Sequence, residues 1–166
     1  MIGDKTLRNL ADAFAGESQA NRKYLAFAKK ADEDGYSQTA RLFRAAAEAE
    51  TVHALNHLKA MDGIKSTEEN LKAAISGETF EFMDMYPKMI EEAKDENAEE
   101  AKLSFIYANK VEQVHADLYG KYLGSLGNNE NTPIFVCQVC GNTVEGNVPD
   151  RCPICGNPRE MFKEIK

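Results

Sequence analysis

The sequence has no apolar run long enough to cross a membrane. No stretch of its 166 residues approaches the roughly 18 consecutive apolar residues of a membrane-spanning helix. The opening residues, Met-Ile-Gly-Asp-Lys, also lack the charged and then apolar pattern of a secretory signal. We therefore expect a cytoplasmic protein without a membrane partner.

Positive charge is also scarce. Lys and Arg number 20 against 27 Asp and Glu, which gives a net charge of −7 with neutral His. Because a nucleic-acid backbone requires a positively charged face, we expect no nucleic-acid partner. The sequence contains no G-x-G-x-x-G motif either, so NAD(P)H is not expected to bind this chain directly.

Cysteine is absent except near the C-terminus. Two C-x2-C pairs fall within the last 30 residues: Cys137, Cys140, Cys152 and Cys155. In a reducing cytoplasm this pattern predicts a four-thiolate metal site and not two disulfides. Tetrahedral sulfur sites take zinc or iron, and on spacing alone a structural zinc ribbon is favoured over an iron site that carries an electron.

Composition divides the chain into a long helical part and a short C-terminal part. Up to about residue 126 it is rich in Ala, Glu, Lys and Leu, whereas from Ile134 onward it is short, β-like and punctuated by Pro and Gly. The predicted divisions are a helical bundle over 1–127, a linker over 128–133 and a small metal-binding domain over 134–166.

Turn-forming residues at 34–35, 62–63 and 95–97 divide the helical part into four predicted helices. We expect a long crossover between about 63 and 76, which favours a ferritin-like four-helix bundle over a plain up-down bundle. Pro87 falls inside the third helix, where it should bend the helix without ending it. The predicted fold class is thus mainly α, with a small β-rich C-terminal domain.

Carboxylates occupy helix positions that should face the core. Each helix has at least one Glu on the stripe where Leu or Ile belongs: Glu17, Glu50, Glu78, Glu81 and Glu112. Burying uncompensated carboxylates costs several kcal/mol each, against a total stability of about 5–15 kcal/mol. Two metal ions would balance the charge of these five groups.

Two E-x-x-H motifs support this interpretation. Glu50-x-x-His53 recurs 62 residues later as Glu112-x-x-His115. Residues three apart share a helix face, so the carboxylate and imidazole of each motif reach one centre. Two such motifs and a Glu from each remaining helix form the ligand set of dinuclear carboxylate sites. His57, Tyr24 and Tyr86 receive no assigned role.

The motifs together resemble those of the rubrerythrin family. The similarity includes Phe-Ala-Gly-Glu17-Ser, both E-x-x-H motifs, Gly-Glu78-x-x-Glu81, Met85-Tyr86-Pro87 and the C-x2-C-G and C-P-x-C-G turns, and it covers nearly the whole chain. It implies iron and not zinc in a rubredoxin-like four-cysteine site, and two non-haem iron ions in the bundle. The gap of eleven residues between the cysteine pairs is shorter than in free-standing rubredoxins.

The resemblance also implies a role for each ligand. Glu50 and Glu112 would bridge the two irons. Glu17 would be terminal on one iron, and Glu78 with His115 on the other. Glu81 and His53 are the candidate catalytic residues, because one iron would take Glu81 as ligand when oxidised and His53 when reduced.

The implied activity is reduction of hydrogen peroxide to water, in protection against oxidative stress. A separate rubredoxin or an NAD(P)H-dependent reductase would supply the electrons. We expect a tail of about 30 residues to be too short on a bundle of this length to reach its own di-iron centre. We therefore expect a homodimer in which one subunit's four-cysteine iron serves the other's bundle, and helix swapping between subunits is a further option. The alternative function is a ferritin-like ferroxidase or iron-handling protein.

Overall fold

The computed structural model describes residues 2–166 and divides the chain into two compact units, Met1–Lys65 and Ser66–Lys166. The helix breaks predicted at 34–35, 62–63 and 95–97 are confirmed, since each lies in a connection between helices. Among the helices of the described chain, none is long and apolar enough to span a bilayer. The two units are described in turn.

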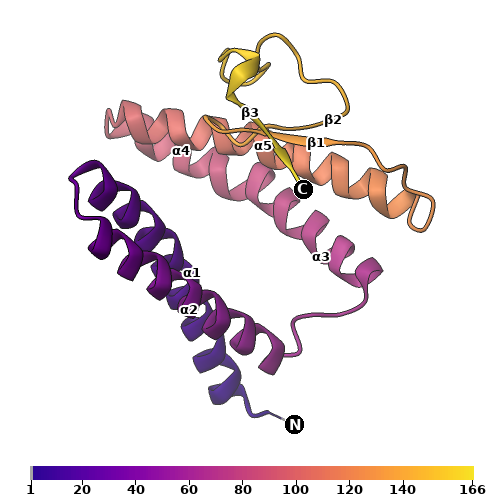
Figure 1. The fold of residues 1–166 in the computed structure, drawn as a ribbon. Helices are drawn as coiled ribbons and strands as arrows, with labels where there is room; N and C mark the ends of the chain where they lie inside the picture. Colours follow the sequence, from indigo (N-terminus) through magenta and orange to yellow (C-terminus); the bar gives the residue numbers. More distant parts are fainter. Residues whose placement is uncertain (1) are drawn as a thin grey trace. The chain divides into compact units, whose positions relative to one another are not determined.

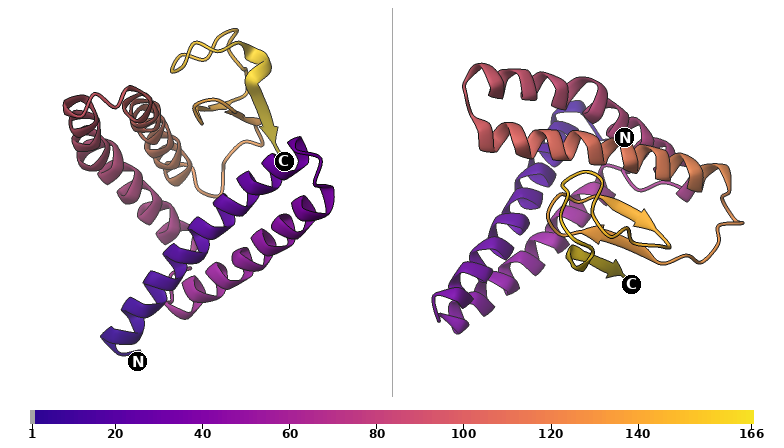
Figure 2. Two further views of the ribbon diagram at one scale, coloured as in Figure 1. Left: turned by 90° about the vertical axis from the view of Figure 1, so that its left-hand side faces the viewer. Right: turned by 90° about the horizontal axis from the view of Figure 1, so that it is seen from above.

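The first unit is a helical hairpin. Helix α1 (Asp4–Glu33) and helix α2 (Ser37–Ala60) lie side by side in every view (Figures 1 and 2). Five alanines are buried in it: Ala28, Ala31, Ala40, Ala47 and Ala54. Small side chains let the two backbones approach closely. The buried amide of Asn21 joins the helices by donating to the Ala47 carbonyl at 2.7 Å and to Thr51 Oγ1 at 2.8 Å.

The second unit begins with a helical run that changes its winding. Helix α3 (Thr67–Phe80) passes into a π-helical segment, η1 (Glu81–Met85), and then into α4 (Tyr86–Asp95). Pro87 lies in the first turn of α4, where its missing N–H is tolerated. The helix therefore continues through Pro87, as predicted, and the π-helical segment precedes it. Helix α5 (Glu99–Gly124) packs against both α3 and α4.

The long crossover predicted between 63 and 76 is wrong. Helix α3 begins at Thr67, so only residues 61–66 connect it to α2. The cause is a capping box: the Ser66 hydroxyl accepts from the Glu69 N–H, and the Glu69 carboxylate accepts from the Ser66 N–H. This pair satisfies two of the free donors at the helix start and fixes it at this position.

A small antiparallel sheet completes the second unit. Strands β1 (Ile134–Cys137), β2 (Thr143–Glu145) and β3 (Phe162–Ile165) have the order β2-β1-β3, and a 3₁₀ turn at Arg159–Met161 precedes β3. The register pairs Val136 with Thr143 and Cys137 with Phe162. Strand β2 contacts α5, so the sheet lies against the helix that supplies part of the site described next (Figure 1).

Candidate metal sites

The four cysteines converge on one point of the C-terminal region. Their sulfurs all lie within 4.8 Å of one another, and none is in a disulfide. Cys137 Sγ is 3.7 Å from Cys155 Sγ, and Cys140 Sγ is 3.5 Å from Cys152 Sγ. Metal–sulfur bonds of about 2.3 Å would place tetrahedral ligands about 3.7 Å apart. The cluster therefore fits a four-thiolate ion.

Tight turns present these sulfurs. The Gly141 N–H donates to the Cys137 carbonyl and the Gly156 N–H to the Cys152 carbonyl. Both glycines have positive φ, 84° and 72°, a conformation that glycine adopts without steric cost. Burial raises the pKa of Cys155, but the N–H groups of Asn157 and the thiols of Cys140 and Cys152 outweigh it and lower the pKa to about 7. Burial raises the pKa of Cys140 instead, so a bound cation is needed to hold all four sulfurs as thiolates, the form that binds metal.

A first group of carboxylates and imidazole lies in the helical hairpin. Glu17 comes from α1, and Glu50 and His53 from α2; one ligand atom of each lies within 4.8 Å of the others. His53 Nδ1 is 2.9 Å from Glu50 Oε2, as expected for positions one turn apart. The His53 side chain is 54% exposed in the chain.

A second group has the same composition and lies in the other unit. Glu78 comes from α3, and Glu112 and His115 from α5. His115 Nδ1 is 2.8 Å from Glu112 Oε2 and 3.7 Å from Glu78 Oε1. Burial, followed by the negative charge of Glu112, raises the pKa of Glu78 to about 7. A cation between these groups would relieve both effects.

The structure thus brings six of the seven predicted bundle ligands into two groups of three, one in each unit. Glu81 lies outside both groups, in the π-helical segment. It is near the second group, because burial and the charge of Glu112 raise its pKa while His115 lowers it. The pKa of Tyr86 is also raised, first by burial and then by Glu112, so its phenol belongs to the same surroundings. Tyr24 packs instead against Phe27 and Phe43.

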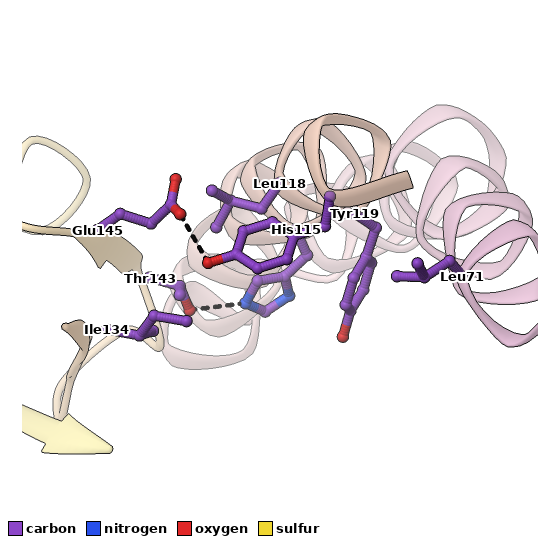
Figure 3. A pocket seen from close by; sticks show the side chains of 8 residues that line it. Leu71, His115, Leu118, Tyr119, Ile134, Thr143 and Glu145 are labelled. Atoms are coloured by element: carbon purple, nitrogen blue, oxygen red, sulfur yellow. Dashed lines mark hydrogen bonds between the residues drawn. The ribbon is translucent and has the colours of Figure 1, made fainter. Parts of the chain in front are cut away.

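One residue of the second group was not identified from the sequence. Thr143 Oγ1 lies 3.0 Å from His115 Nε2, the ring nitrogen that faces away from the carboxylates (Figure 3). The two residues are 28 positions apart, and no local pattern links them. A cavity of about 250 Å³ adjoins this contact, with Leu71, Leu118 and Tyr119 among its lining residues.

The expectation that the C-terminal tail is too short to reach the bundle of its own chain is wrong. The sheet returns along α5, and Thr143 reaches His115 of the same chain. Two further contacts hold the sheet there: Lys121 Nζ and Tyr122 Oη donate to the Glu145 carboxylate at 2.5 Å and 2.8 Å. The tail does not need to extend far, because its attachment point on α5 lies within two turns of His115.

Two family models match the chain. The model described as Rubrerythrin covers residues 8–123, and the one described as Rubrerythrin, rubredoxin-like domain covers residues 135–163. The chain is 36% identical to nigerythrin of Nitratidesulfovibrio vulgaris over 95% of this chain and 85% of that protein. It is 35% identical to rubrerythrin of Porphyromonas gingivalis over 99% of this chain and 92% of that protein.

Solved structures of nigerythrin also match nearly the whole chain. The fully reduced, all-ferrous state of nigerythrin matches 99% of this chain and 88% of its own, with 35% identity and a TM-score of 0.59. A mixed-valence state of nigerythrin matches with a TM-score of 0.58. The predicted fold class, ferritin-like with a small β-rich C-terminal region, is confirmed, apart from the length of the crossover.

Proposed function

Because the chain belongs to the rubrerythrin family of di-iron oxidative-stress proteins, we propose that it reduces hydrogen peroxide to water. Its cofactors are two non-haem irons and one iron in the four-cysteine site, so the zinc preference drawn from spacing alone is wrong. The observation that carries the proposal is the presence, in one chain, of two Glu-Glu-His groups and a four-thiolate site.

The reaction consumes two electrons and two protons for each peroxide and yields two waters. When bound, the iron pair supplies the two electrons that cleave the O–O bond, and the four-cysteine iron replaces them one at a time. The protein supplies ligands and protons. Burial and then the charge of Glu112 raise the pKa of Tyr86, so its phenol stays protonated and can offer a hydrogen bond to an oxygen near Glu112 and Glu78.

Ligand roles are part of the proposal. Glu50 and Glu112 would bridge the irons, with Glu17 terminal on one iron and Glu78 and His115 terminal on the other. Glu81 and His53 would alternate on one iron, as oxidised iron prefers an anionic oxygen ligand and reduced iron tolerates a neutral nitrogen. One observation supports the alternation: Glu81 lies in a π-helical segment, a feature frequent at functional sites.

The length of the connection at 61–66 bears on whether the two helix pairs of one chain can form a single bundle. Helix α2 extends about 10 Å beyond His53, and α3 begins about 16 Å before Glu78. In a ferritin-like bundle α2 and α3 run parallel, so their connection must span about 27 Å along the axis and about 10 Å across it. A fully extended connection of this length reaches only about 25 Å, and the left-handed turn at Asp62 shortens it.

We therefore favour a homodimer with exchanged helix pairs, in which Glu17, Glu50 and His53 of one chain meet Glu78, Glu112 and His115 of the other. The hairpin itself supports this arrangement. It leaves large apolar side chains exposed within the chain, including Leu25, Phe27, Leu42, Val52 and Leu55. Such surfaces are usually covered by a partner.

The electron donor in this proposal is a separate rubredoxin or an NAD(P)H-dependent reductase. The test is stopped-flow reoxidation of anaerobically reduced, iron-loaded protein, followed by the visible ferric–thiolate absorbance. Fast recovery with peroxide and slow recovery with oxygen is the expected result. Recovery with oxygen as fast as with peroxide would instead identify a ferroxidase or oxidase.

A further inference from the structure

The imidazole of His115 is held from both sides. Its Nδ1 faces the carboxylates of Glu112 and Glu78, at 2.8 Å and 3.7 Å. Its Nε2 faces the Thr143 hydroxyl at 3.0 Å (Figure 3). The ring is 27% exposed, half the exposure of His53. Two elements therefore determine its orientation: α5, which carries it, and β2, which contacts it.

The Thr143 hydroxyl also has a second hydrogen-bond partner. Its single hydrogen is donated to the Gly141 carbonyl at 3.2 Å. With its hydrogen placed there, the oxygen accepts from Nε2–H of His115. In a neutral ring protonated at Nε2, Nδ1 carries the lone pair that a metal ion bound between His115 and the Glu112 and Glu78 carboxylates would take up.

We propose that Thr143 is a positioning residue for the second half of the di-iron site: it fixes His115 in the Nε2–H form and presents Nδ1 as the metal ligand. The inference rests on the proposed role of His115 as an iron ligand. Histidine ligands commonly donate their second N–H to a protein acceptor, which fixes the ring and increases its basicity. Here that acceptor comes from the four-cysteine domain.

The hydroxyl is itself firmly placed. Thr143 pairs with Val136 in the sheet, and Glu145, two residues on, is bonded to Lys121 and Tyr122 of α5. On the other side, Gly141 lies close to the buried Val111 of α5: a Cβ on this glycine would be 3.7 Å from Val111 Cγ1. Strand β2 is thus fixed to α5 on both sides of Thr143.

This placement joins the two metal sites of one chain. Gly141, whose carbonyl accepts from Thr143, directly follows Cys140. The path from thiolate to imidazole therefore runs along the backbone from Cys140 to the Gly141 carbonyl and then through two hydrogen bonds that meet at the Thr143 hydroxyl. Cys140 would hold the four-cysteine iron and His115 one iron of the pair, which would supply the redox chemistry, and Thr143 lies between these two ligands.

Three variants distinguish the effect of the Thr143 hydroxyl from the effect of the shape of its side chain. Thr143→Val keeps the branched shape and removes the hydroxyl, and Thr143→Ser keeps the hydroxyl. Thr132→Val makes the same change in the linker and serves as the matched control. The first readout is the ¹⁵N spectrum of the imidazole rings in the full-length, zinc-loaded protein, since zinc is diamagnetic. His53→Gln and His57→Gln variants assign the signals.

The expected spectrum shows Nε2–H and metal-bound Nδ1 for His115 in the wild type and in Thr143→Ser, and a changed or mixed pattern in Thr143→Val. The second readout is Fe(II) affinity, measured by competition with a chelator. Thr143→Val should bind about 10–100-fold more weakly at the carboxylate sites, with Thr143→Ser close to wild type. The ferric–thiolate absorbance should be unchanged in all variants, which shows that the sheet is folded.

An Nδ1–H ring in the wild type would overturn the proposal, as would equal Fe(II) affinity in wild type and Thr143→Val. So would Thr143→Ser behaving like Thr143→Val. Both readouts are independent of turnover. A wild-type protein that fails to reduce peroxide would refute the proposed function and leave the test of Thr143 intact.

Discussion

The side-chain amide of Asn157 donates to Cys155 Sγ across 3.4 Å. The same amide also reaches the Cys155 carbonyl at 3.4 Å, so the side chain is held over one edge of the four-cysteine site. A hydrogen bond to sulfur stabilises the more negative, ferrous form of such a site more than the ferric form. Asn157 should therefore make this iron a better electron acceptor.

Replacing this amide tests its effect on the reduction potential. Asn157→Ala should lower the potential of the four-cysteine iron by about 40 mV, which corresponds to a loss of about 1 kcal/mol for one electron. The measurement is a spectroelectrochemical titration of the ferric–thiolate band. Asn131→Ala, in the exposed linker, is the matched control and should leave the potential unchanged. An equal potential in Asn157→Ala would contradict the argument.

The raised pKa of Glu78 predicts how the stability of metal-free protein depends on pH. Between the ordinary value of 4.5 and the folded value of about 7, the folded chain holds a proton that the unfolded chain has lost. Its contribution to stability is complete below pH 4.5 and is lost as pH rises to 7. The Tm measured by circular dichroism should fall by several degrees over this range.

Glu78→Gln should flatten that slope, because the amide does not titrate. Glu100→Gln, at the exposed start of α5, should keep the wild-type slope. Metal binding requires the Glu78 carboxylate, so adding Fe(II) anaerobically below pH 7 should release protons in wild type and fewer in Glu78→Gln. A Tm of Glu78→Gln that changes with pH as steeply as wild type would show that Glu78 is not the group responsible.

Glu81→Ala tests the proposed ligand exchange. Removing the carboxylate should slow reoxidation by peroxide about tenfold or more and should slow reoxidation by oxygen less, if the exchange belongs to the peroxide reaction. The measurement is stopped-flow absorbance of the reduced, iron-loaded protein with each oxidant. Glu91→Ala, on the exposed face of α4, is the control. Equal losses with both oxidants would count against a specific role in peroxide reduction.

Complementation tests the exchange of helix pairs. Glu50→Ala and Glu112→Ala should each be inactive alone. When the two variants are co-expressed, about half of the exchanged dimers contain one chain of each variant. In such a mixed dimer one di-iron site contains both substitutions and the other contains neither, so about a quarter of wild-type activity should return. Pairing Glu50→Ala with Glu17→Ala, whose defects lie in the same half, should restore none. No recovery in the first pairing would exclude the exchanged dimer.

The sequence predicted those parts of the site that depend on local spacing. The two E-x-x-H motifs place carboxylate and imidazole together because a helix brings positions three apart to one face, and C-x2-C turns do the same for sulfurs. The start of α3 could also have been predicted from the capping-box pattern Ser66-x-x-Glu69, but the predicted crossover extended beyond it. The roles assigned to the individual ligands stay predictions.

Other features could not be read from the sequence. The contact between His115 and Thr143 depends on how the sheet packs against α5, which neither helix periodicity nor cysteine spacing encodes. The π-helical segment at Glu81–Met85 has no composition of its own that distinguishes it from α-helix. The contact depends on tertiary packing, and both features lie near the second metal-binding group.

The π-helical segment also coincides with a difference in spacing between the two helix pairs. Glu17 and Tyr24 are seven residues apart in α1, whereas Glu78 and Tyr86, their counterparts in the second helix pair, are eight apart. A π-helical turn accommodates one additional residue while the helix continues on either side. The second helix pair therefore has one residue more than the first between the corresponding Glu and Tyr, and the π-helical segment lies within that interval. The additional residue distinguishes the second pair from the first at the place where Glu81, the additional carboxylate, lies.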